Sequence, residues 1–357
     1  MHKIDNREHV LDQIKEFVSF QVSERQSLLA VFLVGSIARA DSKWVDVTDV
    51  DIVFVDSDPS AYPEPCIWWQ ESLLIDMHYS KPDDYDDKMS IRTDASCSQD
   101  LYDAVPLYDT KNYFALLQAY VRGQFDTAEN VRARASDALR RAYLHYENIV
   151  KCLDNPVPIP IDPLLVKSLH KSVEWIIVAV LTLSYKPKYG RRSVLAFNDI
   201  LVNNDAIDVI QLFEKTMGFQ NINEVDIDGL RQIWLKCFRA AGIFHEGNWR
   251  TDSCAHPFKE DYYLEGFKSL AEEGHSRESL LLMEYTFVSA FNQIITFAPA
   301  EDAIKYIVKY KHWMQITSKG NDTQFAECID NLTALLHKVE AMIKGFTEES
   351  GVVWNLS

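Results

Sequence analysis

The first hundred residues combine one helical period with several short apolar runs. Residues 5–26 carry apolar side chains every three or four positions, a spacing that predicts a helix. Leu28–Gly35 and Asp49–Asp56 are short runs rich in apolar and β-branched residues, and they predict buried strands. Three further strand candidates are "CIWWQ" at 66–70, "LLIDMHYS" at 73–80 and "AVPLYD" at 104–109. A turn at Glu71-Ser72 could join the first two of these.

After Asp109 the pattern changes to long helical periods, broken by a Pro-rich connector at 155–163 and a basic loop at 184–193. We therefore predict an α+β fold. A mixed sheet flanked by helices forms domain 1–124, and an all-α bundle forms domain 125–357. The predicted helices span 111–123, 127–153, 163–184, 205–218, 226–241, 258–274, 277–297, 299–316 and 322–345.

Composition agrees with an ordinary globular protein of about two domains. Of the 357 residues, 47% are hydrophobic and 25% are charged. No apolar run reaches the roughly 18 residues of a membrane span, and the charged N-terminal segment does not fit a signal peptide. The six cysteines show no CxxC spacing, which indicates reduced thiols. We expect a cytoplasmic protein without membrane attachment.

The negative charge is concentrated in one part of the chain. The formal net charge is -17, and residues 41–109 hold fifteen Asp and two Glu against three Lys and one Arg. Such a surface repels phosphate backbones, so it disfavours a nucleic-acid partner and favours a cationic ligand or metal ions. The stretch "KPDDYDDK" at 81–88 also fits a plain solvated acidic loop.

Three aspartates in strand context are candidates for metal binding. Asp49 and Asp51 alternate with Val50 and Ile52, so the two carboxylates point to one face of their predicted strand. Like charges at that spacing need a cation between them, and Mg²⁺ is the usual partner of such carboxylates. Asp76 on a neighbouring strand would complete a trio able to hold two ions, with Asp76 as the general base.

Gly35 and Ser36 lie at the end of the first predicted strand, where "SIARAD" begins a helix. Glycine lets a phosphate approach the backbone, and the Ser36 hydroxyl and free N–H groups could hold a triphosphate. Positioning and charge neutralisation of this kind are what phosphoryl transfer chiefly requires.

The Gly-Ser pair, the Asp-x-Asp pair and the later aspartate together resemble the nucleotidyltransferase superfamily with the DNA-polymerase-β-type fold. The helical second part is similar to the small-molecule branch, the aminoglycoside and lincosamide enzymes. The resemblance implies two Mg²⁺ ions, ATP or another nucleoside triphosphate as donor, and a small acceptor, with antibiotic resistance as the biological role. It implies metal ligation by Asp49, Asp51 and Asp76, and nucleotide contacts from Gly35 and Ser36.

The sequence also departs from the superfamily pattern. Thr48 stands where a serine usually precedes the Asp-x-Asp pair, and it is carried over as a nucleotide contact. The segment between Gly-Ser and the acids is about two residues longer than in many members and contains Trp44 and Val45.

Several further residues have two interpretations. Arg39 fits either the triphosphate or a pair with an acidic neighbour. For His78 the sequence favours a satisfied structural histidine over contact with the acceptor or orientation of a carboxylate. The resemblance suggests that Lys167 and Lys171 contact the β- and γ-phosphates, with the basic loop 186–192 as the competing candidate. Glu246 is an open candidate for the acceptor site.

Function has three interpretations at this level. The first is transfer of a nucleotide to a hydroxyl of a small, cationic acceptor. The second is modification of a protein or RNA, as in toxin–antitoxin or signalling systems, and the third is a degenerate nucleotide-binding module. Acceptor identity, base preference and a homodimeric state stay open.

Overall fold

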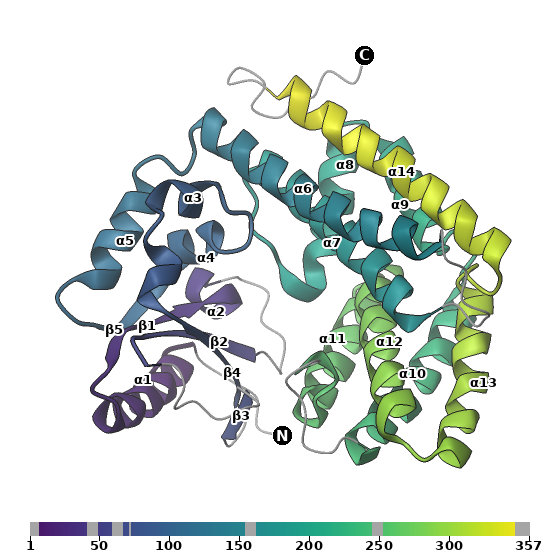
Figure 1. Cartoon of the computed structure of the whole chain (residues 1–357), viewed down its shortest axis with the longest axis horizontal. Helices are drawn as coiled ribbons and strands as arrows, with labels where there is room; N and C mark the ends of the chain where they lie inside the picture. The colour runs from purple at the N-terminus through teal and green to yellow at the C-terminus, as the bar shows by residue number, and fades with distance from the viewer. Residues whose placement is uncertain are drawn as a thin grey trace. The chain divides into compact units, whose positions relative to one another are not determined.

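The computed structural model describes residues 7–40, 49–58, 67–70, 73–153, 162–244 and 253–346 (Figure 1). The chain divides into two compact units, Met1–Asn130 and Val131–Ser357. The first combines a mixed sheet with helices and the second is all helical, which confirms the predicted fold class.

The sheet of the first unit has five strands in the order β3-β4-β2-β1-β5. Strands β2 and β4 are parallel, and the other neighbouring pairs are antiparallel. Each strand coincides with a run that the apolar pattern singled out. The bounds are β1 Leu28–Val34, β2 Asp49–Asp56, β3 Ile67–Gln70, β4 Leu73–Ser80 and β5 Val105–Asp109.

Each face of the sheet has its own apolar core. Helix α1 (Arg7–Glu24) packs on one face against alternate residues of β2 and β4, among them Val50, Ile52 and Ile75. The opposite face carries Phe32 and Val55 and is covered by three further helices (Figure 1). These are α3 (Lys88–Thr93), α4 (Ser98–Asp103) and α5 (Tyr113–Arg122). Because side chains alternate along a strand, Asp51 and Asp76 belong to this second face.

The acidic stretch 81–88 is more than a solvated loop. A 3₁₀ turn spans Pro82–Tyr85, and the Asp84 carboxylate accepts a hydrogen bond from the Lys81 N–H at 2.8 Å. Asp87 caps α3 by accepting from the Ser90 N–H at 3.1 Å. The sequence did not predict α3 and α4, because six residues are less than two turns and show no usable period.

The second unit is built from long helices that the apolar period located well. Helix α8 has Val194, Phe197 and Leu201 buried at helical spacing, but it was not predicted, because residues 194–204 between the basic loop and the next expected helix were left unassigned. The bounds are α6 Ala128–Leu153, α7 Pro163–Leu183, α8 Ser193–Asn203, α9 Ile207–Met217, α10 Glu224–Phe244, α11 Glu260–Glu272, α12 Leu280–Phe297, α13 Ala300–Ile316 and α14 Asp322–Gly345.

Helix α12 forms the centre of this unit and packs on α7, α10 and α13. Among the described residues, one segment, Ser276–Phe297, is long and apolar enough to cross a membrane, and 61% of its apolar window is buried inside the protein. Packing in the core of a helical unit accounts for that composition.

A buried carboxylate joins several of these helices. Glu284 on α12 accepts a hydrogen bond from the Trp313 indole at 3.0 Å, lies 3.2 Å from the Lys319 ammonium and pairs with the His170 Nε2 at 2.8 Å. All four side chains are buried. Burial lowers the pKa of His170 despite its carboxylate partner, so the ring is neutral and donates through Nε2. Burial raises the pKa of Glu284, but Lys319 and His170 outweigh it and hold the pKa at about 2.

We predict that Glu284→Gln destabilises the protein strongly, because it leaves the Lys319 charge buried without its counter-ion. Breaking a buried pair in this way typically costs about 3–5 kcal/mol. Urea unfolding followed by circular dichroism measures the change. The double variant Glu284→Gln/Lys319→Met should recover part of the loss, since it removes both charges.

Glu340→Gln is the matched control, because Glu340 pairs with Lys344 on the surface and its loss should change stability little. The pH dependence gives a second readout. A carboxyl with a depressed pKa stabilises the folded state above about pH 4.5 and loses that contribution as the pH falls to about 2. The difference between wild type and Glu284→Gln should therefore shrink over this range, and a constant difference would contradict the role of the charge.

Candidate functional site

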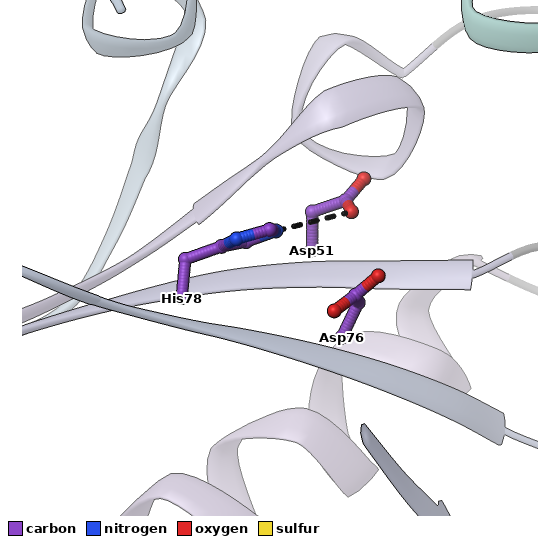
Figure 2. Close-up of side chains that lie close together, drawn as sticks. All are labelled: Asp51, Asp76 and His78. Atoms are coloured by element: carbon purple, nitrogen blue, oxygen red, sulfur yellow. Dashed lines mark ion pairs between the residues drawn. The ribbon is translucent and has the colours of Figure 1, made fainter. Parts of the chain in front are cut away.

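The parallel pairing of β2 and β4 places Asp51 directly opposite Asp76. His78 follows Asp76 by two residues and therefore shares its face of the sheet. One ligand atom from each of Asp51, Asp76 and His78 lies within 4.8 Å of the others, and the three side chains converge in Figure 2. The Nε2 of His78 is 3.9 Å from the Asp51 Oδ1.

The charges of this group are compatible with a bound cation. Carboxylates directly opposite each other on neighbouring strands repel, and the Asp51 side chain is only 28% exposed, so water screens the repulsion incompletely. Two carboxylate oxygens and an imidazole nitrogen are all metal-ligating groups. The residues therefore fit a divalent cation.

Gly35 makes room for one of these carboxylates. It follows the last residue of β1, where Val34 pairs with Asp51, and its φ is +75°. A Cβ at this position would lie under 3.0 Å from the Asp51 Oδ2, a distance that real Cβ atoms do not show. Glycine is therefore required here for two reasons, the left-handed backbone and the carboxylate packed against it.

The Gly-Ser pair opens the predicted helix, α2 (Gly35–Arg39), which is only five residues long. Arg7 of α1 holds this short helix in place, since its guanidinium donates to the carbonyls of Ile37 at 3.1 Å and Ala38 at 3.4 Å. Ser36 and Arg39 are both half-buried. Their contacts with a nucleotide stay predictions.

Two of the three predicted metal ligands come together in the group, and one does not. Asp49 lies two residues before Asp51 on the same face of β2, opposite Leu74, and is outside the group of Asp51, Asp76 and His78. The sequence favoured a structural role for His78, but its side chain is 55% exposed and lies beside Asp51. The sequence signal for this position was its spacing: His78 follows Asp76, a predicted ligand, by two residues in the same strand and so shares its face.

The basic residues of the second unit form a cluster of their own. Lys171 lies 2.8 Å from the Glu174 carboxylate, and Lys188 of the basic loop pairs with the same carboxylate. The two alternative phosphate-binding candidates, the α7 lysines and the basic loop 186–192, therefore share a partner in Glu174. Lys167 and Lys171 lie over the Tyr285 ring, with Nζ 5.6 and 4.8 Å from its centroid.

Glu174 is held as an anion by these lysines. Burial raises its pKa, but Lys188 and Lys171 outweigh that effect and bring it to about 2. Arg191 and Arg192 of the same loop have structural partners, the Tyr262 carbonyl at 3.0 Å and the Glu273 carboxylate. Lys171 and Lys188 are likewise paired, with Glu174, so a nucleotide contact from any of these basic residues stays a prediction. Thr48, Trp44, Val45 and Glu246 lie outside the described residues.

No protein-family model and no curated protein matches this chain. Among solved structures, the chain is similar to a nucleotidyltransferase-like protein from Exiguobacterium sibiricum 255-15, at 10% sequence identity over 91% of this chain and 89% of that one. The TM-score of 0.26 is too low to establish a shared fold. The functional assignment therefore depends on the residues and geometry of the site.

We predict that Gly35→Ala displaces the Asp51 carboxylate and weakens divalent-ion binding. The new Cβ meets Asp51 Oδ2, and the positive φ adds roughly 1–2 kcal/mol of backbone strain. Isothermal titration with Mn²⁺ measures the affinity, and urea unfolding measures stability.

Gly274→Ala is the matched control. Gly274 has a φ of +85° with no atom within 4 Å of its ideal Cβ, so it reproduces the strain without the collision. Equal ion affinity in wild type and Gly35→Ala would contradict the assigned role of Gly35.

Proposed function

We propose that this protein is a metal-dependent nucleotidyltransferase that moves a nucleoside monophosphate from a triphosphate to an acceptor hydroxyl. The observation that carries the proposal is the in-register pair Asp51–Asp76 on parallel strands, with Gly35 fitted against Asp51. The motif "GS" followed by "DVD" and a third aspartate supports it from the sequence. Two adjacent carboxylates held in a rigid sheet are of little structural benefit to the fold and suit a site for cations.

The reaction needs few protein groups. The acceptor oxygen attacks the α-phosphorus and forms a P–O ester bond, while the bond from that phosphorus to the bridging oxygen of the β-phosphate breaks and pyrophosphate leaves. Asp76 would accept the proton of the acceptor hydroxyl. Asp51 and Asp76, together with Asp49 at the end of the same row, would hold the cation. A bound divalent cation supplies charge neutralisation to the triphosphate and the leaving group. Gly35, Ser36, Arg39 and Thr48 are proposed to hold the triphosphate.

The acidic character of residues 41–109 favours a small, cationic acceptor of aminoglycoside type. ATP is the default donor, since no described residue selects a base. Domain 125–357 is proposed to bind the acceptor. A cytoplasmic location and a role in antibiotic resistance are part of the same proposal.

We predict that Asp51→Asn and Asp76→Asn each abolish pyrophosphate release from ATP in the presence of Mg²⁺ or Mn²⁺ and an acceptor. Loss of a ligand carboxylate removes the ion, and loss of Asp76 also removes the base. The matched control is Asp330→Asn, an exposed aspartate of α14 that should retain full activity. Activity retained in Asp51→Asn would refute the metal assignment.

The acceptor class is measured in the same assay with cationic, neutral and anionic hydroxyl compounds. Turnover with cationic acceptors alone, weakened by added salt, supports the proposal.

Incubation of labelled ATP with cell lysate separates the alternative acceptor classes. Label found in the protein or RNA fraction would contradict a small-molecule acceptor. ATP binding without any transfer would indicate a degenerate module.

We predict that Lys171→Ala and Lys188→Ala each weaken ATP binding roughly tenfold, the size expected for loss of one charge-assisted hydrogen bond. Titration with ATP measures the dissociation constant. Lys268→Ala is the control, because its ammonium lies 4.0 Å from Glu265 and Glu272 and so has a comparable acidic environment on α11. Equal effects in all three variants would show a general charge effect and contradict a specific contact.

A further inference from the structure

We infer that His78 is the third protein ligand of the metal site, and that it makes the site selective for first-row transition-metal ions such as Mn²⁺ over Mg²⁺. The inference rests on the proposed function for the existence of a metal site. It goes beyond that function because the superfamily pattern supplies three carboxylates as metal ligands and no histidine.

The positions of the three ligand atoms fit a shared ion. The His78 Nε2 and the Asp51 Oδ1 are 3.9 Å apart, which is too far for a direct hydrogen bond. Two atoms that each bind one ion at about 2.1 Å lie roughly 3.0–4.2 Å apart, depending on the angle between the bonds. All three ligand atoms lie within 4.8 Å of one another, so only a small inward movement of the side chains is needed to bring every pair into this range.

The sheet register makes this arrangement a property of the backbone. Asp51 pairs with Asp76, and Val53 pairs with His78, so the three side chains occupy neighbouring positions on one face of two adjacent strands. The histidine is 55% exposed, which leaves its side of the group accessible from solvent for an entering ion and for phosphate oxygens. Asp49, opposite Leu74, lies at the other end of this row.

The donor set determines the preference among ions. Mg²⁺ binds through oxygen ligands and keeps much of its water shell, whereas imidazole suits first-row transition metals. A set with one imidazole therefore suits a first-row transition metal better than Mg²⁺. Mn²⁺ shares more of the oxygen preference of Mg²⁺ than the later metals do, so a preference for Mn²⁺ is the most stringent test of the imidazole. Three protein ligands also leave coordination positions open for water and a triphosphate.

Metal binding to the full chain tests this inference without reference to turnover. Calorimetric titrations with Mn²⁺ alone and with Mg²⁺ alone are compared for wild type, His78→Ala and His78→Asp. Loss of an outer-shell partner costs about 10–100-fold in metal affinity, so loss of the ligand should weaken Mn²⁺ binding by at least about tenfold. Mg²⁺ binding should change much less, and His78→Asp should shift the preference towards Mg²⁺.

Pulsed electron paramagnetic resonance of the Mn²⁺-loaded protein adds a signature of the bond itself. Modulation from a directly bound nitrogen should be present in wild type and absent in His78→Ala. His312→Asn, a change at an exposed histidine of α13, is the control and should keep both the modulation and the affinity.

The outcomes separate this inference from the proposed function. If Asp51→Asn abolishes Mn²⁺ binding while His78→Ala changes neither the affinity nor the nitrogen signal, the metal site stands and the role of His78 is overturned. If Asp49→Asn weakens both ions equally and His78→Ala has no effect, Asp49 is the third ligand. If Asp51→Asn leaves binding intact, or wild type binds neither ion, the metal site itself fails and both proposals fall.

Discussion

The parallel pairing of β2 and β4 is the constraint on which the site depends. Leu73, Ile75 and Met77 of β4 are buried in the core that α1 covers. A slip of one residue would turn them to the opposite face and bury Asp76 among apolar side chains, so the core fixes the register strongly. The same register sets Asp76 opposite Asp51. The apolar core therefore stabilises an arrangement of like charges that the strands alone would disfavour.

Many of the other acidic residues of this region have ordinary local roles. Asp84 closes the turn at Pro82–Tyr85, and Asp87 caps α3. Asp109 accepts hydrogen bonds from the N–H groups of Phe114 and Ala115 at the start of α5. Caps of this kind stabilise short helices that have little intrinsic stability. Their charges nevertheless add to the negative potential of the unit. Local structure and attraction for cations thus come from the same residues.

The sequence predicted the strands and most long helices because their apolar periods are clear, and the structure confirms the α+β class. It could not predict α3 and α4, whose six residues each are stabilised by caps and by packing on the sheet. Spacing alone placed Asp49 and Asp51 on one face, but only the strand pairing shows that Asp76 and His78 form a group with Asp51. Likewise, the pairing of Lys171 with Glu174 is visible as an i, i+3 spacing on α7, whereas the approach of Lys188 depends on how the loop folds back.

The charges of the protein and of the proposed donor impose a final condition on binding. A triphosphate is strongly anionic, and residues 41–109 carry most of the excess negative charge of the chain. A cation held by Asp51, Asp76 and His78, as proposed, would remove part of that repulsion, and the triphosphate would in turn supply oxygens to the cation. The ion would then strengthen nucleotide binding by the same factor as the nucleotide strengthens ion binding, because coupling between two ligands is reciprocal. The third ligand on β4, by setting which ion occupies the site, would thereby set which ion accompanies the nucleotide.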